Sequence, residues 1–217
     1  MITSEPGKRG PYARTAQFQM EVLHAALGLV AKHGFDAATL QMIADDVGRS
    51  KAGVLHHFGS RDALLLDIVR HRDAVNRHDF PSEPGFGASK RLVEHNQTVP
   101  GLVALFAVMS ALAAADPQLT ERREYFTLRY ARLRGGFKRQ LETAQAAAVI
   151  RSDLGADTLA VLIIAAMDGL QVQWLLDPTL DMVAHLAGLF ELLAGTPSAE
   201  ASPGFDAPAP ANHDQRP

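Results

Sequence analysis

Two short segments in the first third of the chain, each ended by a glycine, constrain its fold more than any other feature. The first has apolar residues at helical spacing and runs from Thr39, a potential N-cap, to Gly48. The second runs from another potential cap, Ser50, to Gly59. Two short helices joined by a glycine turn, after a longer helical segment over residues 15–33, predict a helix-turn-helix.

The second of these helices, residues 51–58, has small, basic and imidazole side chains on the faces that its apolar residues leave free. Gly53 costs about 1 kcal/mol of helix stability relative to alanine, which indicates that another surface approaches the backbone closely. Such a face suits the major groove of DNA, whereas a solvated surface helix is the alternative. The residues predicted to contact DNA lie on this helix and at neighbouring helix starts: Thr39, Arg49, Ser50, Lys51, Ala52, Gly53, His56, His57 and Arg61.

Composition favours an all-α protein of the cytoplasm. Hydrophobic residues make up 47% of the chain and aromatic residues only 6%, which favours helices over sheets. The absence of cysteine excludes disulfides, thiolate zinc sites and cysteine nucleophiles. The N-terminus lacks the apolar core of a signal peptide, and the apolar stretch 101–115 is shorter than the roughly 20 residues of a membrane span. We therefore predict no membrane segment.

The charge distribution is compatible with a small DNA contact. The formal net charge is −3. Between Lys8 and Arg61, however, seven lysines and arginines face four acidic residues, and the chain after Arg77 is net acidic. A mildly basic N-terminal unit on an acidic body fits a specific contact better than a general coat on nucleic acid.

Breaks in the helical pattern divide the chain into five parts. Residues 1–14 are rich in Gly, Pro and basic residues and are predicted to form a flexible arm that can enter the minor groove or remain solvated. Residues 15–60 form the helix-turn-helix domain and residues 61–79 a connecting helix. A Pro/Gly-rich break opens a second helical domain over residues 80–195. The low-complexity tail 196–217 is predicted to be disordered.

Two Asp-Pro pairs predict helix starts in the second domain. Asp116-Pro117 and Asp177-Pro178 each offer an aspartate N-cap followed by proline at the first helical position. They predict helices over 117–148 and 178–194. Between them, residues 157–176 are apolar on most faces, as in a helix buried between neighbours.

Residues 15–66 resemble the N-terminal domain of TetR-family transcriptional regulators. The matching residues are Lys-His-Gly-Phe at 32–35, Ala-Thr-Leu at 38–40, Ile-Ala at 43–44, Val-Gly-x-Ser at 47–50, His-His-Phe at 56–58 and Ser-Arg-Asp-Ala-Leu at 60–64. The resemblance implies a three-helix DNA-binding domain, a fourth linking helix, and an all-helical ligand-binding and dimerisation domain. Leu55 departs from the family, which usually has tyrosine there, and Arg61 replaces a usual lysine.

The resemblance also implies partners. It implies a homodimer formed through residues 157–176 and 178–194, a palindromic double-stranded DNA operator, and a small-molecule effector that releases a repressor from DNA. Candidate pocket residues are polar or aromatic side chains within apolar helices, although each also fits a core or interface role: His95, Phe106, Met109, Tyr125, Phe126, Arg129, Tyr130, Met167, Gln171 and Trp174.

Other functions are less well supported by the sequence. The chain has nine histidines, but His56 and His57 point about 100° apart on a helix, and His71 and His78 lie roughly 10 Å apart. We therefore predict no metal site and no cofactor. No nucleophile, base and acid occur at a recognisable catalytic spacing, so we predict that the chain is not an enzyme. A helical regulator that responds to a protein partner instead of a small ligand remains the alternative.

Overall fold

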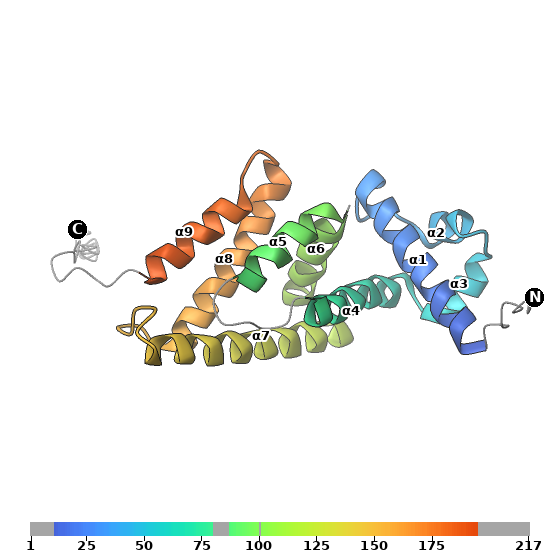
Figure 1. The fold of residues 1–217 in the computed structure, drawn as a ribbon. Coiled ribbons are helices and arrows are strands. Elements are labelled where there is room, and N and C mark those ends of the chain that lie inside the picture. Colours follow the sequence, from blue (N-terminus) through green and yellow to red (C-terminus); the bar gives the residue numbers. More distant parts are fainter. Residues whose placement is uncertain (1–10, 80–86, 100, 195–217) are drawn as a thin grey trace, which may run out of the picture.

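The computed structural model describes residues 11–79, 87–99 and 101–194, and these residues form nine α-helices without a strand, which confirms the all-α prediction (Figure 1). The helices are α1 (Pro11–His33), α2 (Leu40–Asp46), α3 (Lys51–Phe58), α4 (Arg61–Asp79), α5 (Gly87–Thr98), α6 (Leu102–Ala115), α7 (Thr120–Ala146), α8 (Ala156–Leu176) and α9 (Met182–Ala194).

Helices α1–α3 form the helix-turn-helix at one end of the molecule (Figure 1). The Thr39 hydroxyl accepts a hydrogen bond from the backbone N–H of Met42, 3.2 Å away, and so caps α2. The Ser50 hydroxyl accepts one from the N–H of Gly53 at 3.1 Å and caps α3. These two caps and the predicted bounds of α3 are therefore confirmed.

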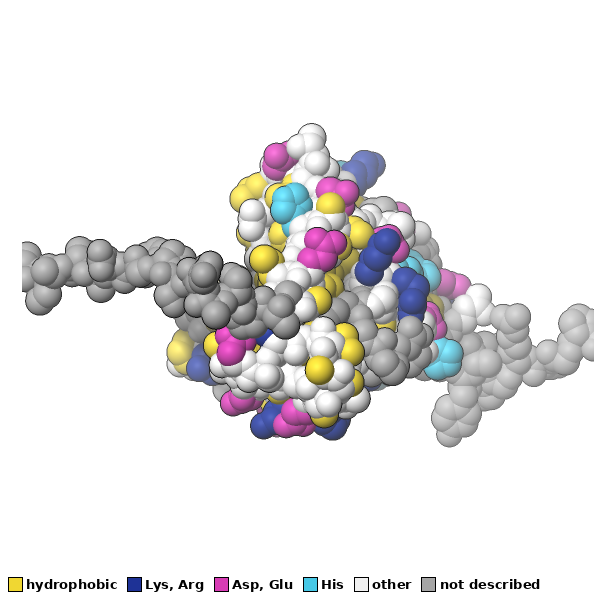
Figure 2. All heavy atoms as spheres, turned by 60° about the vertical axis from the view of Figure 1, so that its left-hand side comes forward, with side chains coloured by type: hydrophobic (Ala, Val, Ile, Leu, Met, Phe, Trp, Pro, Cys, Tyr) yellow, Lys and Arg dark blue, Asp and Glu magenta, His cyan; other side chains and the backbone are white. Residues whose placement is uncertain are grey.

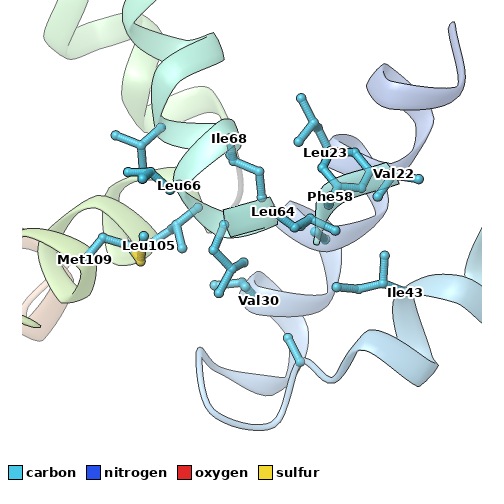
Figure 3. Close-up of a cluster of buried hydrophobic side chains, with 14 of the residues drawn as sticks. Val22, Leu23, Val30, Ile43, Phe58, Leu64, Leu66, Ile68, Leu105 and Met109 are labelled. Atoms are coloured by element: carbon cyan, nitrogen blue, oxygen red, sulfur yellow. The ribbon is translucent and has the colours of Figure 1, made fainter. Parts of the chain in front are cut away.

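The buried apolar side chains form two clusters that do not follow the boundary between the two predicted domains. The first cluster joins α1–α4 to α6 and to Phe126 near the start of α7. Figure 3 shows part of it, with Ile43 and Phe58 from the helix-turn-helix, Leu66 from α4 and Met109 from α6. The second cluster joins α5, the later part of α7, α8 and α9. The helix-turn-helix therefore shares its core with α6.

Long polar side chains link α4 to the first half of α7. Arg70 on α4 forms an ion pair with Glu121 at 2.9 Å, and Asp62 forms one with the buried Arg122 at 3.3 Å. Farther along α4, Asp73 accepts hydrogen bonds from Tyr125 and Arg129 on α7. Because α4 also packs in the first cluster, it connects the helix-turn-helix to the rest of the molecule.

Helix α6 begins in close contact with the backbone of α1. Gly101, the residue before α6, has a φ of 75°, a left-handed conformation that favours glycine. A Cβ atom at this position would lie 2.7 Å from the carbonyl oxygen of Leu27 and 2.8 Å from the backbone nitrogen of Ala31. Only glycine therefore fits between α6 and α1 here.

The predicted helix starts at the two Asp-Pro pairs are wrong. The Asp116 carboxylate accepts a hydrogen bond from the N–H of Gln118, and α7 begins only at Thr120. The Asp177 carboxylate accepts from the N–H of Thr179 in the same way, and α9 begins at Met182. In both places the carboxylate closes a turn two residues ahead, a local alternative to helix capping that the same residues support.

The predicted N-terminal arm is also too long, because α1 begins at Pro11 and not at residue 15. The remainder of the arm, the Pro/Gly-rich break at 80–86 and the predicted tail at 196–217 lie outside the described residues. By length and composition alone, α8 is apolar enough to cross a membrane, and only 28% of its most apolar 18-residue window is buried. Much of the apolar surface of α8 is therefore exposed.

Candidate DNA interface and effector cavity

The outer face of α3 carries the small and basic side chains that the sequence predicts. Lys51, Ala52, Gly53 and His56 are exposed, whereas Val54 and Phe58 are buried in the first cluster. A Cβ atom on Gly53 would lie 3.3 Å from the Ser50 hydroxyl, which is tight but not prohibitive. The absence of a side chain at Gly53 therefore leaves both the cap and the outer face of α3 free of crowding.

The starts of α2 and α3 add hydrogen-bond donors beside this face. Thr39, Arg49 and Ser50 are all exposed. The hydroxyl oxygens of Thr39 and Ser50 accept hydrogen bonds from the helices that they cap, so each hydroxyl can still donate its hydrogen to a phosphate. The guanidinium of Arg49 lies 5.6 Å from the ring centroid of Phe18 on α1. This arrangement offers backbone amides, hydroxyls and a cation on one surface.

Two of the predicted DNA contacts, His57 and Arg61, are half-buried and contact residues of the helix-turn-helix. The ring of His57 packs edge-on against Phe18 and Phe58, with centroids 5.5 and 4.8 Å apart. Arg61 donates a hydrogen bond to the carbonyl of Ala38 at 2.8 Å and another to the carbonyl of Phe35. In this arrangement His57 packs α3 against Phe18 of α1, and Arg61 ties the start of α4 to the loop before α2.

A cavity of about 310 Å³ lies between α4, α5, α7 and α8. Its apolar lining includes Val93 of the second cluster, and Phe137 and Met167, which pack against that cluster. Its most deeply placed polar residues come from all four helices: Arg72 and Asp73 from α4, Asn96 from α5, Arg129 from α7, and Asp168 and Gln171 from α8.

A polar network holds the wall of this cavity together. One oxygen of Asp73 accepts a hydrogen bond from the Tyr125 hydroxyl at 2.6 Å and another from the Arg129 guanidinium at 2.8 Å. The Tyr130 hydroxyl donates to Asp168 at 2.6 Å. Burial raises the pKa of Asp168. Burial and the hydrogen bond that Tyr130 donates to Asp168 raise the pKa of Tyr130.

Arg72 is the most buried charged residue of the cavity. Burial, followed by the charge of Arg129, lowers the pKa of Arg72 to about 10. The guanidinium is therefore still charged at neutral pH. It lies 4.5 Å from the ring centroid of Phe106, as does that of Arg129.

The candidate pocket residues fall into three groups. Met167, Gln171 and Arg129 line the cavity, while Tyr125, Tyr130 and Phe106 contact its charged residues. The others lie away from it: Met109 and Phe126 in the first cluster, Trp174 against the second, and His95 half-buried on α5 outside the lining.

Sequence reasoning missed four of the six most deeply placed polar residues of the cavity. Asp168 had a detectable signal, because it is the one charged residue in the middle of an apolar helix whose other aspartate, Asp157, lies in the first turn. Arg72 and Asp73 lie in a charge-rich helix, and Asn96 in a polar one, so nothing local distinguishes them from surface residues. Within the described ranges, no group of three His, Asp or Glu residues is arranged to hold a metal ion.

An apolar face remains exposed on α8 and α9. Figure 2, which brings the α8–α9 end forward, shows hydrophobic side chains at the surface among acidic ones. The exposed residues of this face are Val161, Leu162, Val172, Leu175 and Leu176 on α8 and Leu192 on α9.

Family models match both parts of the chain. The model described as "Bacterial regulatory proteins, tetR family" matches residues 22–68, which span the second half of α1, α2, α3 and the start of α4. A second model, "BetI-type transcriptional repressor, C-terminal", matches residues 90–194, which carry most of the cavity and the apolar face.

Relatives with established names are transcriptional repressors. The chain is 25% identical over 155 residues to the HTH-type transcriptional repressor AcnR of Corynebacterium jeikeium, a match that covers 71% of this chain and 79% of that protein. It is 33% identical to AcnR of Corynebacterium glutamicum over 67 residues, which cover 31% of this chain and 35% of the relative.

Solved structures share the fold. A transcriptional regulator from Saccharomonospora viridis, in complex with choline, superposes with a TM-score of 0.66 at 24% identity, covering 81% of this chain and 96% of that one. A TetR transcription regulator from Haloarcula marismortui superposes with a TM-score of 0.67 at 20% identity, covering 82% and 97%. Both family models, the named relatives and the fold agree, and the chain therefore belongs to the TetR family of bacterial regulatory proteins, which control transcription by binding DNA.

Proposed function

We propose that this chain is a dimeric transcriptional repressor of the cytoplasm that leaves its DNA operator when a small molecule enters the cavity between α4, α5, α7 and α8. The observation that carries the proposal is the exposed face of α3 beside the capped starts of α2 and α3. The relatives named as repressors support repression rather than activation. The activity proposed is binding and not catalysis.

Lys51 and Gly53 are the residues proposed to meet the base edges of the major groove. Lys51 carries a donor that fits the acceptors of guanine, and Gly53 lets the backbone of α3 approach the groove floor. Thr39, Ser50 and Arg49 are proposed to hold phosphates on either side, since they position the protein without reading sequence.

DNA binding is tested on the region upstream of the chain's own gene, by gel shift and footprinting. The wild type should protect a palindromic site. Lys51→Ala should weaken binding about 5- to 100-fold, because a good base contact is worth about 1–3 kcal/mol. Gly53→Asp should abolish binding by adding bulk and negative charge, whereas Lys138→Ala, an exposed lysine on α7, serves as the control and should leave it unchanged. Binding by all four proteins with equal affinity would contradict the proposal.

The apolar face of α8 and α9 is proposed to pack against the same face of a second copy. Such an isologous contact would bury the exposed apolar residues of α8, which also explains its composition without a membrane. A dimer of this kind presents two α3 helices to half-sites about one DNA turn, roughly 34 Å, apart.

The dimer is tested by light scattering coupled to size-exclusion chromatography. Val161→Glu with Val172→Glu places two charges in the proposed interface, and we expect a monomer that has lost operator affinity. Leu128→Glu is the matched control, because Leu128 is an equally exposed apolar residue on α7. A double variant that keeps the mass of a dimer would place the interface elsewhere.

A further inference from the structure

The cavity between α4, α5, α7 and α8 has a surplus of positive charge. Its lining includes five arginines, two on α4 and three on α7, against the two carboxylates of Asp73 and Asp168. Asp73 already accepts hydrogen bonds from Tyr125 and Arg129, and Asp168 accepts one from Tyr130. Because both carboxylates are engaged, the lining presents mainly positive charge to a ligand.

Hydrogen-bonding groups without a partner gather in this cavity. In the part of the chain that the structure describes, six buried side-chain nitrogen or oxygen atoms lack a hydrogen-bond partner. Five of them belong to cavity residues: Nε and Nη1 of Arg72, Nη1 of Arg129, Oδ1 of Asn96 and Oε1 of Gln171. Arg72 is only 6% exposed. A buried unpaired donor costs about 1–3 kcal/mol, and more when charged, so these groups point to a polar ligand.

The amide of Gln171 has a defined orientation. Its Nε2 donates to the carbonyl of Met167 at 3.2 Å, and exchanging the two amide atoms would bring two acceptors together. The oxygen is therefore the unpaired atom, and it calls for a donor on the ligand.

The aromatic ring beside the cavity is not available to a cationic ligand. The guanidiniums of Arg72 and Arg129 each lie 4.5 Å from the centroid of Phe106, and that of Arg129 also lies 5.5 Å from that of Tyr130. A quaternary ammonium needs such ring faces for itself, and here it would also meet like charges. The protein's own cations occupy the places that an organic cation would use.

We propose that the cavity binds a small organic anion. Arg72 and Arg129 bind its carboxylate or phosphate group, and Asn96 and Gln171 accept hydrogen bonds from a hydroxyl or N–H of the same molecule. Guanidinium groups suit this task because their N–H donors match the geometry of carboxylate and phosphate oxygens. A volume of about 310 Å³ is at the lower end for ligand pockets and suits a small metabolite.

This inference rests on the proposed function for its biological consequence. An anion held by Arg72 and Arg129 would contact α4 and α7 together, at the point where Asp73 links them. Arg61 ties the other end of α4 to the loop before α2, about 18 Å from Asp73 along the helix. Binding would therefore act on the helix that positions the DNA-reading face.

The test is thermal unfolding of the full chain without DNA, at constant ionic strength, in sodium malate, sodium succinate, glycerol 3-phosphate, inorganic phosphate or choline chloride. We expect malate or glycerol 3-phosphate to raise the melting temperature in a saturable way, and which of them does so distinguishes a carboxylate from a phosphate ligand. Succinate lacks the hydroxyl of malate, and inorganic phosphate lacks the carbon-bound hydroxyls of glycerol 3-phosphate, so both should act more weakly. A rise with choline alone, or none with any anion, would overturn the proposal.

Variants identify the binding residues by calorimetric titration with the effective anion. Arg72→Met removes a buried charge while keeping apolar volume, and it should weaken the Kd by about 10- to 100-fold. Arg72→Lys should recover part of the loss. Arg134→Met is the matched control, since Arg134 is exposed on the same helix as Arg129 but lies outside the cavity lining.

Equal anion affinity in Arg72→Met and Arg134→Met would contradict the proposed role of Arg72. Gln171→Leu should remove the preference for malate over succinate if the hydroxyl meets Oε1. None of these measurements involves DNA. A chain that binds the anion but no operator would refute the proposed repressor alone, and a chain that binds the operator but no anion would refute this inference alone.

Discussion

Replacing Gly101 by alanine tests the contact between α6 and α1. Two costs add up at this position. A residue with a Cβ atom at a φ of 75° costs about 1–2 kcal/mol relative to its preferred conformations. The new Cβ would also lie 2.7 Å from a backbone oxygen of α1, where ordinary contact begins at 3.4 Å, so α6 must move by about 0.7 Å. Overpacking of this kind costs about 1–3 kcal/mol.

The expected loss of stability for Gly101→Ala is therefore about 2–5 kcal/mol. For a chain of this size, the melting temperature should fall by about 4–20 °C in a thermal scan followed by circular dichroism. Gly34→Ala is the matched control, because Gly34 has a φ of 86° but nothing within 4 Å of its added Cβ. It should show the conformational cost alone. If both variants lose the same stability, the close approach of α6 to α1 does not constrain the fold.

Three further predictions concern α4 and the cavity. Asp73→Asn leaves Arg129 without its buried acidic partner, and unfolding in urea should show a loss of about 3–5 kcal/mol, whereas a loss below about 1 kcal/mol would contradict the pairing. Burial and the hydrogen bond to Asp168 raise the pKa of Tyr130, so its contribution to stability is complete below the ordinary tyrosine pKa of about 10 and is lost as the pH rises above it. Tyr130→Phe should therefore lose stability less steeply than the wild type between pH 10 and 11, and equal slopes would exclude this role. Arg61→Met should lower the melting temperature by removing two hydrogen bonds to backbone carbonyls; unchanged stability with weaker DNA binding would instead make Arg61 a phosphate contact.

The sequence was sufficient where structure depends on neighbouring residues. The caps at Thr39 and Ser50 bond to amides three residues ahead, so these caps, with the apolar spacing and the two glycines that end the segments, predicted α2 and α3. The same kind of reasoning failed at Asp116 and Asp177, because an aspartate before proline can close a turn as readily as it caps a helix. Local patterns therefore predicted most elements but not which of two local hydrogen-bonding modes was used.

The cavity depends on contacts between residues far apart in the sequence. Asp73 meets Tyr125 and Arg129, more than fifty residues later, and no spacing rule connects them. The inward position of His57 likewise depends on Phe18 in α1. Gln171 was predicted because a polar residue in an apolar helix is unusual, and the same argument applied to Asp168 would have predicted it too.

The apolar cluster shared by α1–α4 and α6 limits how this chain can be cut and recombined. A fragment ending at Asp79 would carry Leu66 and Ile68 without Leu105 and Met109, which lie in the same cluster (Figure 3). A DNA-reading head transplanted onto another sensor would therefore expose apolar surface unless α6 travelled with it. The DNA specificity of this protein should therefore change more readily by substitutions on the exposed face of α3 than by exchange of whole domains. The part of this protein that can be exchanged as one piece is the set of helices that share the first cluster, and not the helix-turn-helix alone.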